Sequence, residues 1–378
     1  MTAAFRRLAQ GLAAFVLWAV SAIAPAAAGD PFALDWRELG PGVYAGIRPV
    51  SYFQPVVGTS VIVVGDDGVL VFDPGGFPLQ SERIADKIAE ITDKPVTSIV
   101  ISHWHGDHSF GLYKLLDRYP HAQVIAHEFT AKAFQSPLMD YAKPASEEDA
   151  ARQKERLAKL LATGRNASGE TLSQQQKAFY QYSLDYFDLI NAQIAAIKIP
   201  QPTRTFASSV TLDLGGRRVE LHHFGKGNTK GDIVAYLPDA RILLAGDVIV
   251  RPTPYGFGSY PEDWAGVLKR IKSLHVDMIV PGHGEVLTDA AYIDTLISTL
   301  TLVVDTVGKA VSDGLSLDET RTALDWSAIE PQFTNCDPLL AQLFEIWFKT
   351  PIVEAQYTLA TGGDNEALAP DATEPNQH

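Results

Sequence analysis

Short apolar runs alternate with amphipathic segments along the first part of the chain. Residues 43–47, 59–64 and 69–73 are rich in β-branched side chains and lie between Gly and Asp turns, so we expect three short strands there. The sequence DDG at 66–68 separates the last two and predicts a hairpin turn. Apolar side chains three and four residues apart predict a helix over 81–91, with Ser81 as its N-cap.

The same alternation continues through the next segment. A strand over 97–102 runs directly into His103, and it is followed by a helix over 111–119 and a strand over 122–126. Strands and helices in this order are typical of a layered α/β fold.

Residues 137–200 differ from their surroundings in composition. Residues 149–162 and 173–197 are rich in Ala, Gln, Lys and Glu, and they predict two helices joined by a loop at 164–169. We interpret this segment as a helical insertion. It either packs on the edge of the fold or forms a lid over an active site.

Beyond the insertion the strand and helix pattern resumes. The expected strands are 204–213, 217–224, 232–237, 241–245 and 276–280, and the expected helices are 261–274 and 290–309. We predict one large domain over 29–300, a C-terminal helical extension over 301–361, and a disordered tail over 362–378 that is rich in Asp, Glu, Pro and Asn.

The N-terminus carries the pattern of a secretory signal peptide. Two Arg precede an apolar run over 8–23, and small residues follow up to Ala28. A Gln-Gly pair interrupts the run, which is also short for a membrane span. We predict a signal peptide over 1–28, and hence a periplasmic or secreted protein without a stable membrane anchor after cleavage.

The charge and the residue composition of the chain limit the partners and the kinds of site that we expect. The net charge of −14 disfavours nucleic acid as a partner, because binding to phosphate backbones depends on Lys and Arg. Cys336 is the single cysteine of the chain, which excludes an intrachain disulfide and Cys-rich metal clusters. The 10 His are therefore the main candidates for chemistry.

The strongest signal is the sequence HWHGDH at 103–108. His103, His105, Asp107 and His108 supply imidazole and carboxylate groups of the kind that zinc prefers, and they follow a predicted strand directly. We expect Gly106 to provide the backbone freedom for a turn here. We expect the Trp of the motif to pack rather than to contact substrate.

Other strands deliver candidate ligands in the same way. Asp247 ends one buried apolar run, and His283 ends another and lies between two Gly. Asp73 also follows an apolar strand, and we expect it to orient one of the His from behind.

These motifs and their order resemble the metallo-β-lactamase superfamily over roughly residues 40–290. The matching positions are Asp73, the 103–108 motif, the Gly-Asp pair at 246–247 and the sequence PGHG at 281–284. The resemblance implies an α/β fold, the four-layer αβ/βα sandwich, with a metal site along one edge of its sheets. It also implies that His103 and His105 bind a first metal together with a further His. Asp107, His108 and His283 would bind a second metal, with Asp247 between them or close by.

The resemblance further implies a small-molecule hydrolase with one or two zinc ions. Zinc lowers the pKa of bound water from about 15.7 toward 7, and the resulting hydroxide would attack a carbonyl centre (lactam, lactone or thioester) or a phosphoryl centre. Asp107 would help to move its proton. The alternatives are a mononuclear iron oxidoreductase on the same fold and a metal-binding protein that has lost catalysis. One branch of the superfamily, the diiron flavoproteins, usually has Glu at the position of His105, so His105 counts against that branch.

One position departs from the family pattern. Residues 225–232 have the sequence GKGNTKGD, and Asn228 stands where the further His is usual. An amide oxygen is a weaker zinc ligand than imidazole. The first site either keeps its metal through Asn228 or a water that Asn228 holds, or stays empty, or recruits His222 or His223. Asn228 could also be a turn residue without a metal role.

The loop over 251–260 follows Asp247 and is rich in Gly, Pro and aromatic residues. It suits a wall beside the metal site, although aromatic residues in such a loop often only pack. Tyr255 or Tyr260 could donate a hydrogen bond to a substrate there. We predict Tyr255 as a catalytic residue beside Asp107.

Overall fold

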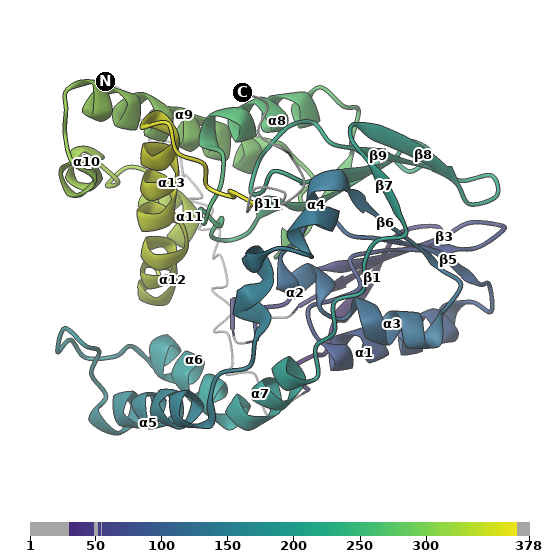
Figure 1. The fold of residues 1–378 in the computed structure, drawn as a ribbon, viewed down its shortest axis with the longest axis horizontal. Helices are drawn as coiled ribbons and strands as arrows, with labels where there is room; N and C mark the ends of the chain where they lie inside the picture. The colour runs from purple at the N-terminus through teal and green to yellow at the C-terminus, as the bar shows by residue number, and fades with distance from the viewer. Residues whose placement is uncertain (1–29, 49–51, 54, 369–378) are drawn as a thin grey trace, which may run out of the picture.

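The computed structural model describes residues 30–48, 52–53 and 55–368 (Figure 1). The predicted signal peptide over 1–28 and the end of the predicted tail lie outside these residues. Within them, the strands form a sheet of seven and a sheet of five.

The sheet of seven holds the strands from the first part of the chain. In spatial order these are β1 (Asp35–Gly40), β2 (Val43–Ile47), β3 (Ser60–Val64), β4 (Val69–Phe72), β5 (Val96–Val100), β6 (Gln123–His127) and β7 (Arg204–Phe206). Neighbours from β1 to β4 are antiparallel, and those from β4 to β7 are parallel. Val64 pairs with Val69, which confirms the hairpin turn predicted between β3 and β4.

The sheet of five has the spatial order β12 (Met278–His283), β11 (Ile242–Val250), β10 (Val234–Leu237), β9 (Arg218–His222) and β8 (Ser209–Asp213). β11 and β12 are parallel, and the other pairs are antiparallel. The single strand predicted over 204–213 is wrong: β7 and β8 belong to different sheets, because the chain bends at 207–208 and crosses from one sheet to the other.

Helices cover the outer face of each sheet, and apolar side chains from the inner faces fill the space between the sheets. α1 (Pro78–Ile91) and α3 (Leu112–Arg118) pack on the sheet of seven, and α8 (Pro261–Lys272) and α9 (Ala291–Ser312) pack on the sheet of five (Figure 1). This is the predicted αβ/βα four-layer sandwich. α1 begins at Pro78 rather than at Ser81, because Pro has a helical φ and needs no N–H partner at a first turn.

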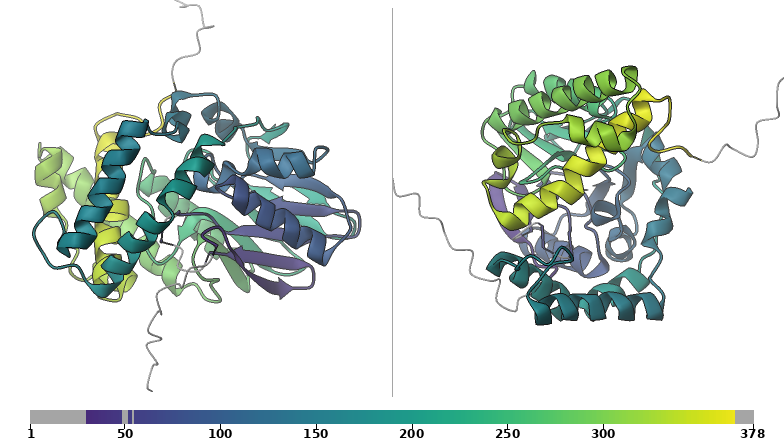
Figure 2. Two further views of the ribbon diagram at one scale, coloured as in Figure 1. Left: turned by 90° about the horizontal axis from the view of Figure 1, so that it is seen from below. Right: turned by 90° about the vertical axis from the view of Figure 1, so that its left-hand side faces the viewer.

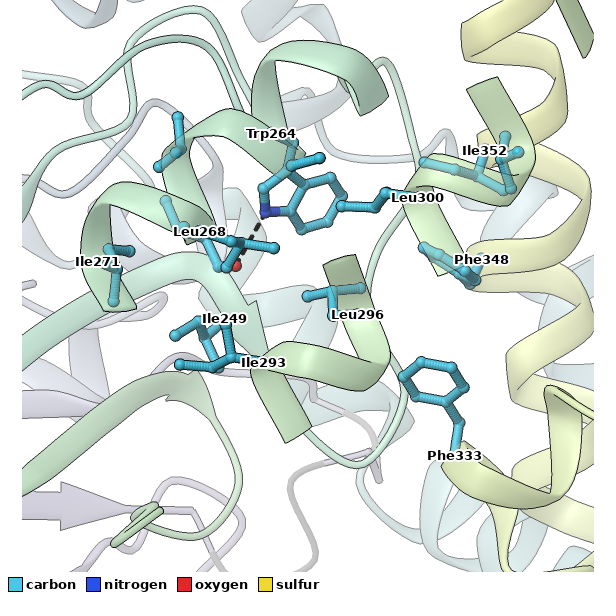
Figure 3. Packing of buried hydrophobic residues seen from close by; sticks show 14 of the residues in the cluster. Ile249, Trp264, Leu268, Ile271, Ile293, Leu296, Leu300, Phe333, Phe348 and Ile352 are labelled. Atoms are coloured by element: carbon cyan, nitrogen blue, oxygen red, sulfur yellow. Dashed lines mark hydrogen bonds between the residues drawn. The ribbon is translucent and has the colours of Figure 1, made fainter. Parts of the chain in front are cut away.

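The core under α8 and α9 extends into the C-terminal helices. Trp264 of α8 is fully buried and donates its indole N–H to the carbonyl of Val248 at 2.9 Å (Figure 3). Phe348 and Ile352 join the same apolar cluster. The C-terminal elements are α10 (Leu317–Ala323), α11 (Glu330–Thr334), α12 (Pro338–Phe344), the π-helical turn η2 (Glu345–Lys349) and α13 (Thr350–Ala360).

The predicted boundary between residues 300 and 301 is therefore wrong. It falls inside α9, whose buried face packs against α8 and α13 in one continuous core. By length and composition, α9 could also cross a membrane. Its apolar side is already covered within the sandwich.

The insertion consists of η1 (Pro137–Ala142), α5 (Glu147–Thr163), α6 (Gln174–Asp185) and α7 (Phe187–Ala195). The second helix, predicted over 173–197, is broken at Tyr186 into α6 and α7. α5 and α6 lie outside the sheet layers, at the end of the molecule that also carries α12, and α7 leads from them back toward α1 (Figure 1); Figure 2 shows the insertion from two further sides. Phe179 of α6 packs with Phe53, Leu339 and Leu343 in a separate small core.

Two short helices follow strands of the sheet of seven. α2 (Gly106–Ser109) lies within the HWHGDH motif, and α4 (Glu128–Ala133) follows β6.

Candidate metal centre

The candidate ligands meet because the strands that carry them end at the same edge of the two sheets. The 103–108 motif follows β5, Asp247 lies within β11, and His283 ends β12. Gly282 allows this close approach, since a Cβ at that position would lie 2.0 Å from Asp247 Oδ1.

The structure brings six of the seven predicted ligands into two groups. One group is His103, His105 and Asp247, and the other is Asp107, His108, Asp247 and His283. Within each group the possible ligand atoms lie within 4.8 Å of one another. Asp247 belongs to both groups, in keeping with the bridging position that the resemblance implies.

The two oxygens of Asp247 face different groups. Oδ1 lies 3.0 Å from His108 Nε2, and Oδ2 lies 3.7 Å from His103 Nε2. In the second group, His283 Nε2 lies 3.0 Å from Asp107 Oδ2 and 3.1 Å from His108 Nε2. The Nε2 atoms and carboxylate oxygens therefore converge, as they would around cations.

A hydrogen-bond network holds two of these imidazoles from behind. Asp73 Oδ2 lies 2.8 Å from His108 Nδ1, and Asp73 also accepts hydrogen bonds from the backbone and hydroxyl of Ser102. Ser102 Oγ lies 2.9 Å from His103 Nδ1. Both rings thus use Nδ1 for support and present Nε2 to the centre. This confirms the predicted place of Asp73, whose φ of 61° is uncommon for a residue other than Gly.

The charges of the centre suit a cation. Burial holds the pKa of His103 well below its usual range and also lowers that of His105, so both rings are neutral lone-pair donors. Burial opposes the ionisation of Asp247, but His108 and His283 outweigh it and lower its pKa to about 2.

His108 is surrounded by acids. Burial alone would lower its pKa, but Asp247, Asp107 and Asp73 raise it well above the usual value. Burial opposes the ionisation of Asp107, but His108 and His283 outweigh this effect and lower its pKa. Three carboxyl groups around one buried imidazole give an excess of negative charge, which a bound divalent cation would balance.

Unpartnered polar atoms support the fit to a metal. His103 Nε2 and Asp247 Oδ2 are buried, and they lack hydrogen-bond partners within the described part of the chain. Buried polar groups are rarely left in this state, because their desolvation is not repaid. Imidazole and carboxylate donors are ligands of zinc, so the residues present fit that ion.

Asn228 is held in one orientation by the loop after β11. The residue is 1% exposed, and its Nδ2 donates to the carbonyl of Tyr255 at 2.9 Å. Its Oδ1 is buried and finds no donor among the described residues. The amide therefore keeps a free acceptor, as a metal role for Asn228 requires, and that role stays a prediction.

The alternative that His222 or His223 replaces the missing ligand finds no support in the geometry. His222 Nε2 lies 3.3 Å from Glu220 Oε2 and its ring stacks on Phe224. His223 donates from Nδ1 to the carbonyl of Asp232 at 2.8 Å and stacks on the ring of His127. Neither belongs to the two ligand groups.

The two predicted substrate-facing tyrosines differ in position. The ring of Tyr255 lies 5.2 Å from that of His283 and 5.3 Å from that of Trp347, so it forms a wall beside the centre. Its catalytic role stays a prediction. Tyr260 is 2% exposed and donates its hydroxyl to Asp364 at 3.0 Å, so the idea that it serves a substrate is wrong.

Gly106 is needed for a different reason from the one predicted. Its φ is not positive; instead, a Cβ there would lie 2.1 Å from the ring of Phe110. Its backbone N–H donates to the hydroxyl oxygen of Tyr141 at 2.6 Å. Sequence reasoning missed Tyr141, because nothing in its local pattern places the insertion against the metal-binding motif.

The predicted disordered tail is wrong over its first part. Glu366 is 3% exposed and accepts a hydrogen bond from Trp104 Nε1 at 2.5 Å. The indole itself is 8% exposed and packs in the core beneath α1 and α3, as predicted for the Trp of the motif. Its acidic partner was missed, since the two residues are 262 positions apart.

Comparison with known proteins agrees with this geometry. The profile of the metallo-beta-lactamase superfamily matches residues 54–283. This chain therefore belongs to that superfamily of metallo-hydrolases.

Among its relatives, the linear primary-alkylsulfatase of Pseudomonas sp. (strain ATCC 19151) is 23% identical over 295 residues, covering 75% of this chain and 52% of the relative. The metallo-beta-lactamase type 2 of Bacillus cereus is 33% identical over 94 residues, covering 23% of this chain and 36% of the relative. The solved stereoselective inverting sec-alkylsulfatase Pisa1 from Pseudomonas sp. shares the fold with a TM-score of 0.60 at 14% identity, covering 91% of this chain and 52% of that one. The matches thus cover about half or less of the length of each of these relatives.

Proposed function

We propose that the protein is an exported, zinc-dependent hydrolase of small molecules. It would act at a carbonyl centre of a lactam, lactone or thioester, or at a phosphoryl centre. The observation that carries the proposal is the position of Asp247, whose two carboxylate oxygens face two separate groups of His and Asp side chains.

The proposed ligands are His103 and His105 at the first site and Asp107, His108 and His283 at the second, with Asp247 between them. Asn228 would offer its unpartnered Oδ1 to the first site. When bound, zinc supplies a Lewis acid and lowers the pKa of water.

In this proposal, two side chains would act on the substrate. The side chain of Asp107 is 23% exposed, which makes it more accessible than the other two carboxylates of the centre, and it would hold or pass on a proton. The ring of Tyr255 lies 5.2 Å from that of His283, and its hydroxyl would donate to an oxygen of the substrate.

A second candidate is hydrolysis of a sulfate ester with an apolar alkyl group. It is favoured by the extent of the alkylsulfatase match, 295 residues against 94 for the lactamase. The wall beside the centre also suits an apolar group: Tyr255 contacts Trp347, and Trp347 packs against the small core of Phe53 and Phe179.

The test is a hydrolysis screen of the zinc-loaded protein with lactams, lactones, thioesters, phosphodiesters and alkyl sulfates. We expect the protein to hydrolyse one class of these substrates. Asp107→Asn should lose this activity, and added zinc alone should not restore it. Turnover of alkyl sulfates alone would select the second candidate. Retained iron with oxidation of a substrate would contradict both, as would metal binding without hydrolysis of any class.

Export is proposed from the leader pattern over 1–28 alone. N-terminal sequencing of the protein from the periplasm of an expressing bacterium tests it. Cleavage after Ala28 would support the proposal, and an intact leader in the cytoplasm would contradict it.

A further inference from the structure

The C-terminal segment 364–366 reaches back to the candidate metal centre. Glu366 accepts hydrogen bonds from Trp104 Nε1 at 2.5 Å and from the backbone N–H of Lys230 at 2.6 Å. At 3% exposure, this carboxyl group is almost fully removed from solvent. The hydrogen bonds from these two donors compensate part of the loss of hydration.

The two donors belong to loops that carry proposed ligands. Trp104 lies between His103 and His105, and Lys230 lies two residues beyond Asn228. The first loop comes from the sheet of seven, and the second joins β9 to β10 in the sheet of five. One carboxyl group therefore connects the loop of His103 and His105 with the loop of Asn228.

Neighbouring residues fix the segment to a third loop. Asn365 donates from Nδ2 to the carbonyl of Ser259 at 2.6 Å. Asp364 accepts from Tyr260 at 3.0 Å and from Lys230 Nζ at 2.5 Å. Ser259 and Tyr260 belong to the loop that also holds Tyr255. The segment is thus tied to three of the loops around the centre.

We propose that residues 364–366 are a positioning element of the metal centre, in which Glu366 holds the loop of His103 and His105 in register with the loop of Asn228. The proposal rests on the proposed function, since it concerns how the chain would hold zinc. Glu366 contacts none of the proposed ligands itself and acts through Trp104 and Lys230.

The first site would need such an element because one of its proposed ligands, Asn228, is a weak one. An amide oxygen in place of an imidazole binds zinc less tightly, so the alignment of the remaining ligands matters more. A displacement of either loop would separate His103 and His105 from Asn228. Holding both loops through one buried acid reduces that freedom before metal binds.

The experiment compares three variants with the parent chain, each loaded with zinc or cobalt. The first ends after Gly363 and lacks the segment. The second ends after Leu368, keeps the segment, and serves as the matched control. The third is Glu366→Gln, which keeps the shape of the side chain but replaces one accepting oxygen with a donor. The readouts are the rate at which a chelator removes zinc, the visible absorption spectrum of the cobalt form, and the melting temperature of the metal-free form.

We expect the chain that ends after Gly363 to lose the more weakly held zinc about tenfold faster than the parent, and Glu366→Gln to lose it several-fold faster. The cobalt spectrum should change in both, and the control should match the parent. A change in melting temperature with unchanged zinc release and an unchanged spectrum would overturn the proposal in favour of a purely structural role. If the shortened chain does not fold, Glu366→Gln decides alone.

The outcome separates this inference from the proposed function. A parent chain that binds zinc and hydrolyses a substrate, with release rates equal in all variants, would overturn only the positioning role. A parent chain that binds no metal would overturn both.

Discussion

Asn228 donates a hydrogen bond from its amide nitrogen to the backbone carbonyl of Tyr255 at 2.9 Å. This contact joins the loop after β9 to the loop after β11 and fixes which atom of the amide remains free. The free atom is the oxygen, the only part of an Asn side chain that could bind a metal. The departure from the family pattern at this position is therefore compatible with a retained but weaker first site.

Restoring the usual imidazole should strengthen that site. We expect Asn228→His to raise the zinc content toward two ions per chain, because imidazole binds zinc more tightly than an amide does. Elemental analysis after dialysis against a weak chelator measures this. Asn228→Ala is the control and should lower the content. An unchanged zinc content in Asn228→His would mean that the first site is already full or cannot form.

Gly282 offers a second test of the same geometry. In Gly282→Ala the new methyl group would overlap Asp247 Oδ1, at 2.0 Å, so we expect the carboxylate to move and zinc to be lost. The matched control is Gly266→Ala in α8, where nothing lies within 4 Å of the added atom. That control should keep its zinc and gain about 0.5–1 kcal/mol of stability from helix propensity. Full zinc occupancy in Gly282→Ala would refute the position assigned to Asp247.

The stacked pair of His127 and His223 should make stability depend on pH. The ring centroids are 4.1 Å apart, and burial together with His223 lowers the pKa of His127 to about 4. Because the unfolded chain protonates this residue near its ordinary value of 6.5 and the folded chain does not, stability contributed by the neutral ring is lost as the pH falls from 6.5 toward 4.

Replacing this histidine should reduce that dependence, and the part due to His223, whose pKa burial also lowers, should remain. Relative to the parent, His127→Gln should gain about 1 kcal/mol between pH 7 and pH 5, after allowance for partial exposure. Urea unfolding of the metal-free proteins at the two pH values measures it. His121→Gln, at an exposed position, is the control. An equal pH dependence in the parent and in His127→Gln would contradict the account.

The insertion should affect substrate choice more than metal content. All proposed ligands come from the two sheets and their loops, whereas α6 touches the rest through the small core of Phe53, Phe179, Leu339 and Leu343. Deleting 145–195 should therefore change the range of substrates while zinc is kept. Phe179→Ala should weaken the packing by about 3 kcal/mol and shift KM, with Leu189→Ala, exposed by 38%, as its control. Loss of zinc together with the fold in the deletion would show that the insertion is structural.

The sequence predicted those parts of the centre that follow directly from strand ends. Asp73, the 103–108 motif, Asp247 and His283 each come after an apolar run, so local pattern marked them as candidates, and the family resemblance implied that they meet along one edge of the sheets. The same local pattern could not show that the chain changes sheets at 207–208, because both pieces have strand character.

Contacts between distant segments could not be predicted either. Glu366 lies in a polar, acidic stretch that resembles a disordered tail, and its burial depends on donors from two remote loops. Tyr141 and Trp347 similarly reach the centre through the packing of helices. In each case, contacts between distant segments determine where the residue lies, and composition does not reveal such contacts.

Metal analysis of the purified protein beside its Asp247→Asn variant tests the central claim most directly. Asp247 is shared by both ligand groups, so its carboxylate should be required for either site. We predict that the parent retains one to two zinc ions per chain and that Asp247→Asn retains almost none, with an unchanged far-ultraviolet circular dichroism spectrum. A parent chain without bound metal, or an Asp247→Asn variant with undiminished zinc, would contradict the account.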